Sequence, residues 1–405
     1  MRPLRPLFWA SAFALAYTYL LFPLLLLARA ALRPRSFVAA DITPSVTIVV
    51  AAHNEARGIG AKLENLLSLD YARDCLEVVV ASDGSDDGTN EILRRYADGG
   101  VRPLLLPRRG KSEALNAAVA IAGGEIIVFT DANSIFESGA LRALVAPFAD
   151  PTVGGVAGNQ VYLEGGERDG SAIGERRYWN VDRMLKEAQS RAGSVTGATG
   201  AIYAIRRELF RPVPPGLNDD FITSLRVIEQ GRRLVFARDA VAYEAVSKSR
   251  EVEFERKVRV MTRGLHCTLA IPALLDPRRH GFYSIQLVSH KLLMRSMAAP
   301  LAVAAVSAPL LWRRGSIYRV ATVLQGLFYS LAAVGLAFSR TGLGRQRLVA
   351  LPAYFCFMMA ASVRAWWNVV RGRRVDRWEP QRDGAPDVAA AGGQLHDVPR
   401  TVASR

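Results

Sequence analysis

Four acidic or polar clusters between residues 46 and 221 hold side chains that could do chemistry together. They are His53-Asn54-Glu55, Ser82-Asp83-Gly84-Ser85-Asp86-Asp87, Asp131-Ala132-Asn133 and Asn218-Asp219-Asp220. Each of the first three follows a short apolar run of the β type, and in an open α/β sheet the carboxyl ends of the strands form the crevice where ligands bind. Carboxylates that converge there can hold a nucleotide, a divalent metal ion and a reacting hydroxyl group.

Asp83 stands where the second apolar run ends. A carboxylate at that position can accept hydrogen bonds from a base N–H group or from a ribose hydroxyl. An ordinary turn is the alternative, because Asp, Gly and Ser are common turn residues. For Asp86 and Asp87 the sequence favours turn and N-cap roles before a helix that begins at Thr89.

Asp131 follows an apolar run of a central strand, where an unpaired carboxylate is costly. A magnesium or manganese ion is one suitable partner, since such ions combine one or two carboxylates with substrate phosphate oxygens. Asn133, two residues further on, can add a neutral carbonyl oxygen to the same ion. The alternative for Asn133 is a helix N-cap.

Gly110-Lys111-Ser112 is similar to the end of a phosphate-binding loop. The first glycine of that loop would fall at position 105, which is Leu105, so a true P-loop is excluded. Lys111 at a helix N-terminus can still favour a phosphate group. An ordinary surface lysine is the alternative.

Asp219 and Asp220 open a helix that we expect over residues 219–230. Two carboxylates at a helix start complement the helix dipole, which needs no function. The functional alternative is that one of them is a general base, which must lie beside a reacting hydroxyl group.

A basic amphipathic helix is expected over residues 250–269. Its cations are Arg256, Lys257, Arg259 and Arg263. A surface that faces lipid headgroups explains them without a catalytic role. The functional alternative has Arg263 neutralise a leaving diphosphate.

The elements that must position these groups alternate between strand and helix. Strands are expected at 46–51, 76–81, 102–106 and 125–130, and helices at 56–69, 89–97 and 111–121. This alternation predicts an α/β fold with a mostly parallel sheet and right-handed crossovers. After residue 150 the pattern changes to strand-like runs at 153–163 and 195–205 with a helix between them.

The composition favours one sizeable domain attached to a membrane. The chain has 405 residues, of which 50% are hydrophobic, a mean hydropathy of +0.12 and a net charge of +15. Basic residues gather beside the apolar runs, so anionic lipid headgroups are the expected partner. No recognition motif supports nucleic-acid binding, and three scattered cysteines give neither a disulfide framework nor a zinc site.

Four apolar runs are long enough to span a bilayer core of roughly 30 Å. The first, over 7–28, has a signal peptide as its alternative, but it is long for that and basic sequence follows at once. We expect a retained anchor within residues 1–30, and Arg29, Arg33 and Arg35 predict a cytoplasmic domain after it. The other spans are expected at 287–311, 317–338 and 348–370. Charges early in the 287–311 run predict an interfacial helix before a buried part near Met297.

These features divide the chain into an anchor (1–30), a cytoplasmic domain (40–250), amphipathic or interfacial helices (250–286), three spans (287–370) and a basic, disordered tail (371–405). The tail is polar, rich in Ala and Gly, and shows no periodicity. The side of the membrane on which the C-terminus lies stays open, because the span count places it outside whereas the basic run after residue 370 favours the inside.

Taken in order, the motifs resemble those of membrane-bound family 2 inverting glycosyltransferases, the relatives of cellulose synthase, hyaluronan synthase and poly-N-acetylglucosamine synthase. The resemblance covers residues 46–300. It rests on segments 46–55, 81–89, 110–116, 129–133, 197–207 and 217–221. It implies a Rossmann-like GT-A domain that uses a nucleotide-diphosphate sugar, most often a UDP-sugar, with Mg²⁺ or Mn²⁺.

The resemblance also implies a role for individual residues. Asp220 matches the catalytic base at the end of the T-E-D motif. The donor-binding positions are Ala52, Asn54, Glu55, Asp83, Lys111, Asp131 and Arg263. Asp131 and Asn133 occupy the D-x-D position that binds the metal ion. Gly197, Thr199, Gly200 and Asp219 match the acceptor side.

Two departures from the family pattern matter. Asn133 replaces the second acid of D-x-D, which puts the affinity for metal in doubt. The Q-x-x-R-W motif of processive synthases should fall at 260–264, where only Arg263 survives and Gly264 stands at the Trp position. An aromatic platform for an acceptor sugar is therefore missing, and transfer of one or a few sugars is at least as well supported as polymerisation.

The expected function is transfer of a sugar, with a β-linkage, to a glycan or lipid acceptor in cell-envelope or exopolysaccharide synthesis, at the inner membrane of the cell. The expected partners are the nucleotide-sugar donor, that acceptor and membrane lipids, with no nucleic acid. Two other classes stay open: a nucleotidyltransferase, which would release pyrophosphate, and a non-catalytic membrane protein that binds sugar nucleotides.

Overall fold

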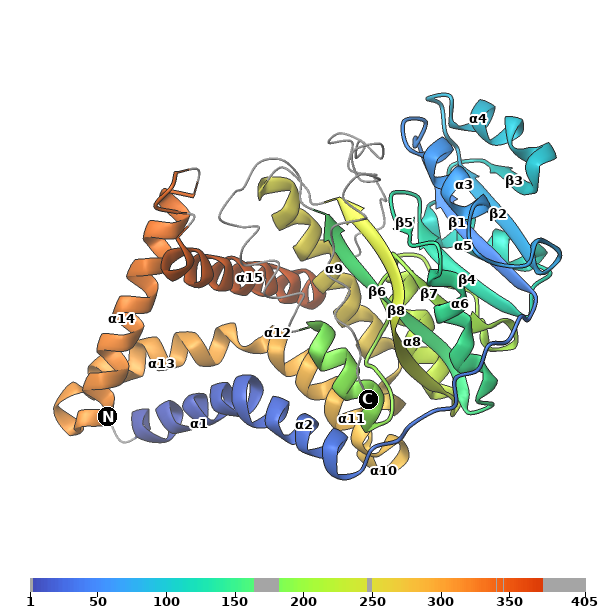
Figure 1. The fold of residues 1–405 in the computed structure, drawn as a ribbon. Coiled ribbons are helices and arrows are strands. Elements are labelled where there is room, and N and C mark those ends of the chain that lie inside the picture. The colour runs from blue at the N-terminus through green and yellow to red at the C-terminus, as the bar shows by residue number, and fades with distance from the viewer. Residues whose placement is uncertain (1–2, 164–181, 246–249, 340, 345, 374–405) are drawn as a thin grey trace.

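In the part of the chain that the structure describes, eight strands form one mixed sheet at one end of the molecule, and long apolar helices gather at the other end (Figure 1). The computed structural model describes residues 3–163, 182–245, 250–339, 341–344 and 346–373. The strands are β1 (Val46–Ala52), β2 (Leu76–Asp83), β3 (Val101–Leu106), β4 (Ile126–Asp131), β5 (Ile135–Phe136), β6 (Val153–Leu163), β7 (Tyr203–Arg206) and β8 (Arg233–Ala245). Their order across the sheet is β3-β2-β1-β4-β7-β6-β8-β5.

The first four strands confirm the predicted parallel α/β arrangement. β1 pairs in parallel with β2 and with β4, and β2 pairs in parallel with β3. The connections contain α3 (Ile59–Leu67), α4 (Thr89–Arg95) and α5 (Lys111–Ile121). Ala51 stands opposite both Ala81 and Asp131 in the register. The polar clusters that follow β1, β2 and β4 therefore lie at the same edge of the sheet.

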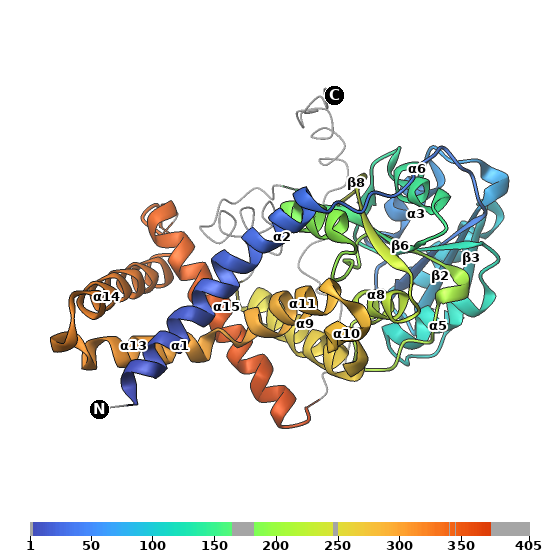
Figure 2. The ribbon, with the colours of Figure 1, turned by 90° about the horizontal axis from the view of Figure 1, so that it is seen from below.

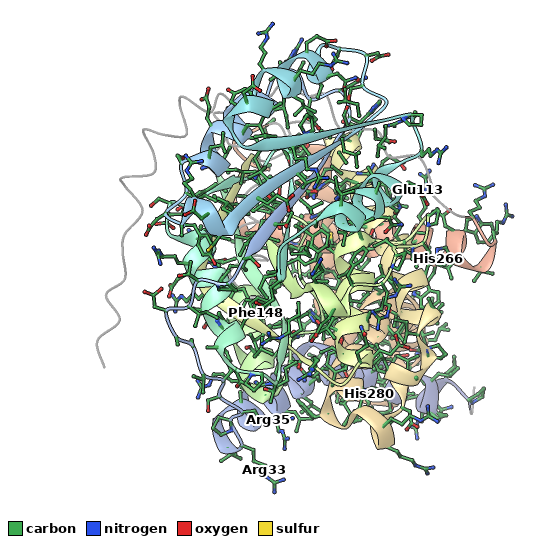
Figure 3. All side chains as sticks on the ribbon, turned by 90° about the vertical axis from the view of Figure 1, so that its right-hand side faces the viewer. Arg33, Arg35, Glu113, Phe148, His266 and His280 are labelled. Atoms are coloured by element: carbon green, nitrogen blue, oxygen red, sulfur yellow. The ribbon has the colours of Figure 1, made fainter. Side chains whose placement is uncertain are left out.

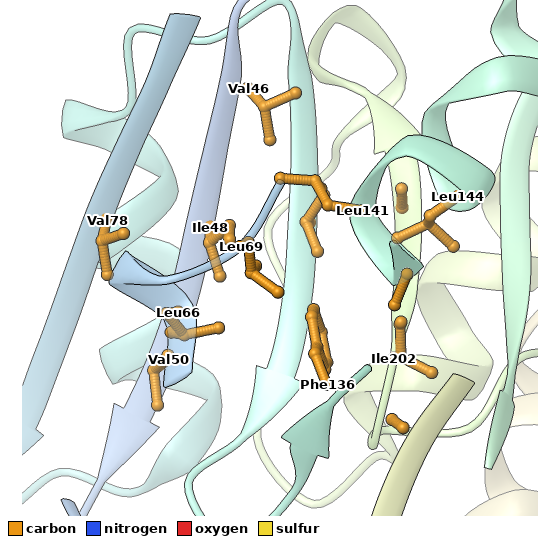
Figure 4. Close-up of a cluster of buried hydrophobic side chains, with 14 of the residues drawn as sticks. Val46, Ile48, Val50, Leu66, Leu69, Val78, Phe136, Leu141, Leu144 and Ile202 are labelled. Atoms are coloured by element: carbon orange, nitrogen blue, oxygen red, sulfur yellow. The ribbon is translucent and has the colours of Figure 1, made fainter. Parts of the chain in front are cut away.

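Two apolar layers cover the sheet. On one face, Ile48 and Val50 of β1 share a cluster with Leu66 of α3 and with Leu141 and Leu144 of α6 (Ala140–Val145), as Figure 4 shows. The intervening β1 residues, at 49 and 51, belong to a second cluster with residues of α5 and α8 (Asp219–Glu229). Burial on both faces explains why β1 is a continuous apolar run rather than an alternating one.

The strand expected over 195–205 forms only at its end. β7 begins at Tyr203 and pairs antiparallel with β4 and β6. The residues before it, after a helix over 182–192, form an irregular loop. In that loop Val195 donates its N–H group to the carbonyl of Leu234, and Ala198 donates its N–H group to Oγ of Ser224. The run is apolar because this loop is buried, and burial alone does not make a segment extended.

Within the described residues, three helical segments are long and apolar enough to cross a membrane. They are Leu4–Leu32, which contains α1 (Leu4–Ala16) and α2 (Phe22–Leu32), and the helices α14 (Ser316–Ala337) and α15 (Arg347–Val370). A fourth candidate is a bent pair, Phe282–Ser296 and Ala298–Leu310, with an angle of 52° between its parts. The single span expected over 287–311 is therefore broken at Met297.

A layer of helices lies between the sheet and the apolar helices (Figures 1 and 2). It contains α9 (Arg250–Ala270), α10 (Pro277–His280), α11 (Phe282–Leu287) and α12 (Met294–Ser296), and α13 (Ala298–Leu310) follows. Figure 3 shows Arg33, Arg35 and His280 at one edge of the molecule. The tail expected over 371–405 lies outside the described residues from 374 onward.

Candidate active site

One ammonium group bridges two carboxylates from distant parts of the chain. Nζ of Lys111, at the start of α5, lies 2.7 Å from Oδ1 of Asp131 at the end of β4 and 3.1 Å from Oδ2 of Asp219 at the start of α8. Burial opposes the charged form of Lys111, but the charges of Asp131 and Asp219 outweigh it and raise the pKa of this ammonium group. The structure thus brings three predicted site residues into direct contact.

Asp220 stands beside this bridge in the first turn of α8. Burial, followed by the charge of Asp219, raises the pKa of the Asp220 carboxyl to about 7, against the opposing effect of Lys111. Its Oδ1 accepts a hydrogen bond of 2.7 Å from the backbone N–H group of Phe221. A carboxyl group with a pKa near neutrality is well matched to accepting a proton from a hydroxyl group.

The loop before β7 packs against Asp131 and Phe221. A Cβ atom added to Gly200 would lie 2.7 Å from Oδ2 of Asp131, and one added to Gly197 would lie 2.6 Å from the Phe221 ring. Oγ1 of Thr199 is buried and has no hydrogen-bond partner in the part of the chain that the structure describes. A buried hydroxyl without a partner costs free energy, so a ligand that satisfies it would be favoured here. This loop is one wall of the candidate site.

Asp83 has a positioning role. Its side chain is 1% exposed, and it accepts hydrogen bonds from the backbone N–H groups of Arg109 (2.6 Å) and Gly110 (2.9 Å) and from Nη1 of Arg108 (3.0 Å). These bonds hold the loop that precedes Lys111. The carboxylate presents almost no surface to a ligand. The structure shows Asp83 as a support of this loop, and its expected contact with a base stays a prediction.

The end of β1 supplies three further predicted residues. Ala52, the last residue of β1, is buried in the core. Asn54 turns the chain with a φ of 55°, and its N–H group donates to Oγ of Ser85 at 3.1 Å, which ties this loop to the one after β2. Burial, followed by the charge of Asp131, raises the pKa of the Glu55 carboxyl to about 7. Of the three, Glu55 is the one in electrostatic contact with the acids described above.

Lys62 is a site residue that the sequence interpretation missed. It is fully buried on α3, and its Nζ donates hydrogen bonds to Oγ1 of Thr130 (2.9 Å) and to the carbonyl of Ser134. It thereby holds both ends of the turn between β4 and β5. Burial lowers the pKa of Lys62 to about 7. Its position on the apolar stripe of α3, between Ile59 and Leu66, was a usable signal, because a lysine on that stripe must point inward.

Asn133 forms a hydrogen bond with the carboxylate of Glu244, a residue that no sequence motif indicated. Its Nδ2 donates to Oε1 of Glu244 on β8 at 3.0 Å, and Nε2 of Gln160 on β6 donates to the other carboxylate oxygen. The N-cap alternative for Asn133 is wrong, because the two-residue strand β5 follows it rather than a helix. Glu244 comes near this turn only through the order of the strands, so its local sequence carries no sign of the contact.

The groups at the end of β4 fit a hard divalent cation. Asp131 offers a carboxylate and Asn133 an amide oxygen, and the ammonium group of Lys111 shows that Asp131 attracts a cation. Among the residues that the structure describes, no three His, Cys, Asp or Glu side chains gather closely enough to hold a metal ion. An ion held here would therefore take further oxygen ligands from substrate phosphates and water, as magnesium commonly does.

Helix α9 connects the site to the membrane-side helices. Nδ2 of Asn218 donates to the carbonyl of Val260 at 3.3 Å, so α9 packs against the start of α8. Arg263, the predicted diphosphate-binding residue, is half-buried on α9. At the next position, a Cβ atom added to Gly264 would lie 2.6 Å from Nη1 of Arg295. Arg263 thus lies on the helix that joins the acids to the broken span.

Comparisons with known proteins agree with this geometry. Residues 47–213 match the family model for glycosyl transferase family 2. An N-acetylglucosaminyltransferase from Rhizobium sp. (strain N33) is 25% identical over 309 residues, which are 71% of this chain and 68% of that protein. A poly-beta-1,6-N-acetyl-D-glucosamine synthase from Staphylococcus aureus (strain COL) is 24% identical over 241 residues, 57% of each chain. The chain spans about half to two thirds of the length of the curated relatives it matches.

Among solved structures, the chain is similar to the mannosyltransferase PcManGT from Pyrobaculum calidifontis, determined in complex with GDP-Man and Mn²⁺. The identity is 28%, the TM-score is 0.65, and the match covers 89% of this chain and 99% of that one. The likeness therefore extends beyond the sheet to the apolar helices. On the family match, the related sequences and the GT-A-like fold, the chain carries a glycosyltransferase family 2 domain that includes residues 47–213.

Proposed function

We propose that this protein is a membrane-bound inverting glycosyltransferase that transfers a sugar from a nucleotide-diphosphate sugar to a glycan or lipid acceptor and forms a β-linkage. The observation that carries the proposal is the contact of Lys111 with Asp131 and Asp219, beside the buried Asp220 carboxyl. This reaction needs an acid on the donor side, a cation for the leaving group and a base for the acceptor hydroxyl. Asp131, Lys111 and Asp220 can supply these three groups.

In the proposed reaction, a hydroxyl oxygen of the acceptor attacks the anomeric carbon of the donor sugar. The bond from that carbon to the diphosphate breaks as the new bond forms, and the diphosphate leaves with the electron pair. Asp220 takes the proton of the hydroxyl group. Lys111 and Arg263 stabilise the negative charge of the leaving group. A single displacement inverts the anomeric centre, so an α-linked donor gives a β-linked product.

A divalent cation, Mg²⁺ or Mn²⁺, belongs to the proposal. Asp131 and the amide oxygen of Asn133 would hold it, and it would supply positive charge to the diphosphate. The complex of PcManGT with GDP-Man and Mn²⁺ supports this part. The names of the two curated relatives favour N-acetylglucosamine as the sugar.

The proposal places the catalytic domain, 40–250, in the cytoplasm and the apolar helices in the inner membrane. The candidate spans and the cations after α2 support this placement. The helices over 250–286 would then lie at the membrane surface. Cell-envelope or exopolysaccharide synthesis is the process that the relatives' names favour.

The direct test is release of nucleoside diphosphate by the purified full-length protein in detergent, with UDP-, GDP- and dTDP-sugars and with or without Mg²⁺ or Mn²⁺. We expect release with one donor, in the presence of metal, and its loss in Asp220→Asn. Release of pyrophosphate instead would identify a nucleotidyltransferase. Binding of a donor without any release, even after a native lipid extract is added, would favour the non-catalytic alternative.

A further inference from the structure

Two cations lie on one face of the broken span at the membrane side of the site. Lys291 and Arg295 are four residues apart in continuous helical structure that runs through a π-helical turn over Val288–Leu293, so their side chains project in nearly the same direction. Both are half-buried, and most of their neighbours in this segment are apolar. Like charges at this spacing repel each other, and the repulsion is stronger away from water. An anion between them would relieve it.

Lys291 lies close to the catalytic acids. Nζ of Lys291 lies 5.3 Å from the centre of the Phe221 ring, the residue after Asp220, and Lys291 interacts electrostatically with Asp220 itself. The carboxylate of Asp182, which pairs with Nζ of Lys186 at 3.0 Å, also interacts electrostatically with Lys291. Lys291 therefore places a positive charge close to the base.

Arg295 occupies the space beside Gly264. A Cβ atom at residue 264 would lie 2.6 Å from Nη1 and 2.9 Å from Nη2 of Arg295. This is the position at which the Q-x-x-R-W pattern has a tryptophan, and a large side chain at residue 264 would collide with the guanidinium group. The chain thus presents a cation where an aromatic ring would suit a sugar.

An apolar groove adjoins Arg295. Nε1 of Trp366 donates a hydrogen bond to the carbonyl of Arg295 at 3.1 Å, and Trp366 also lines a groove of about 480 Å³ between α9 and α15. Phe254, Val363, Arg364 and Trp367 form other parts of its wall. One side of the groove is α15, which is a candidate membrane span. The helical turn that carries Arg295 therefore adjoins a mostly apolar groove.

We propose that the acceptor is a membrane lipid with a phosphate in its headgroup and a free hydroxyl beside that phosphate. The phosphate binds Lys291 and Arg295, the hydrocarbon chain lies in the groove, and the hydroxyl faces Asp220. The proposal rests on the proposed function and names the class of its acceptor. The hydroxyl oxygen forms the new bond to the anomeric carbon, its proton goes to Asp220, and the nucleoside diphosphate leaves.

The test uses the full-length protein in nanodiscs that contain phosphatidylcholine with one added lipid: phosphatidylglycerol, a polyprenyl diphosphate sugar, or diacylglycerol. Labelled sugar that enters the lipid extract is measured, as is nucleoside diphosphate. We expect product with one of the two phosphate-bearing lipids, which also distinguishes between them. Transfer to diacylglycerol alone would overturn the proposal. Transfer of the sugar to water is measured as nucleoside diphosphate released without labelled lipid. Such release in any disc supports the glycosyltransferase assignment independently of the acceptor.

Lys291→Gln and Arg295→Gln should raise the KM for the lipid about tenfold or more, because a hydrogen bond to a charged group is lost, while the KM for the donor stays nearly the same. Arg295→Lys should restore part of the effect. Arg314→Gln is the matched control, because it removes one positive charge from an exposed turn. Native mass spectrometry of lipids retained by the purified protein gives a readout without turnover. Equal retention of both phosphate-bearing lipids by the wild type and the Lys291/Arg295 double variant would contradict the proposal.

Discussion

Nζ of Lys111 lies 2.7 Å from Oδ1 of Asp131, so the start of α5 and the end of β4 are joined by an ion pair in the middle of the candidate site. Asp83 positions the loop before Lys111, because its carboxylate accepts hydrogen bonds from the backbone N–H groups of the two residues before Lys111. A diphosphate or a metal ion that binds at Asp131 would therefore interact electrostatically with this ammonium group.

Asp220→Asn should lower the rate of nucleoside diphosphate release by about 10²-fold to 10⁴-fold, because the general base is removed. Donor affinity, measured by calorimetry, should stay close to that of the wild type. Asp239→Asn is the control, since Asp239 is an exposed acid on β8. Near-normal turnover in Asp220→Asn would show that another residue accepts the proton.

The pH profile should rise through neutrality. Asp220 acts as a base only when deprotonated, and its pKa is raised to about 7, so kcat/KM should fall below that pH. Lys111 lowers the pKa of Asp220, so in Lys111→Gln the acid limb of the residual activity should move to higher pH. Glu55, whose pKa is also about 7, is checked with Glu55→Gln. If the acid limb of the pH profile shifts in Glu55→Gln but not in Lys111→Gln, the titrating group is Glu55 rather than Asp220.

Asn133→Asp should tighten binding of Mn²⁺ in the presence of the nucleotide, because a second carboxylate joins Asp131. Without metal, the same change places an acid against Glu244 and removes the donated hydrogen bond, so the thermal stability of the apo protein should fall. Calorimetric titration of Mn²⁺ and thermal unfolding measure the two effects. Glu244→Gln in the Asn133→Asp background should recover the stability. An unchanged metal titration would remove Asn133 from the metal site.

Gly200→Ala should weaken donor and metal binding, because the added methyl group would lie 2.7 Å from Oδ2 of Asp131 and must displace that carboxylate. Gly139→Ala is the matched control, since nothing lies within 4 Å of a Cβ atom there. Binding of UDP with Mn²⁺ is the measurement. If both variants bind as the wild type does, the loop before β7 does not constrain Asp131.

Lys62→Met should change how stability depends on pH. Burial lowers the pKa of Lys62 in the folded protein to about 7, whereas an unfolded lysine has a pKa of about 10.4. Between these values the unfolded chain binds more protons, so the wild type should gain stability as the pH rises from about 7 to about 10. The variant should lack this part of the rise. Parallel pH curves of thermal unfolding for the two proteins would show that Lys62 stays charged in the fold.

The local pattern was sufficient for β1 to β4 and for α3 to α5, whereas the short elements β5 and α6 were not predicted. Continuous apolar runs followed by polar clusters predicted β1, β2 and β4, and the rules for parallel crossovers placed their carboxyl ends at one edge. The positions of Asp131 and Lys111 at a strand end and a helix start follow from the same pattern. The apolar run over 195–205 became a strand only from Tyr203 onward, because burial of a loop produces the same composition as a buried strand.

What the sequence determined by itself is the family pattern, the α/β core and the positions of the acids on their elements, because these depend on short-range periodicity. The tertiary structure decided where each side chain points and which distant segment it meets. Asp83 turns inward to hold a loop, Glu244 reaches Asn133 across the sheet, and Arg295 lies against Gly264. Such contacts depend on strand order and helix packing, and no local spacing encodes the direction of a side chain toward a segment far along the chain.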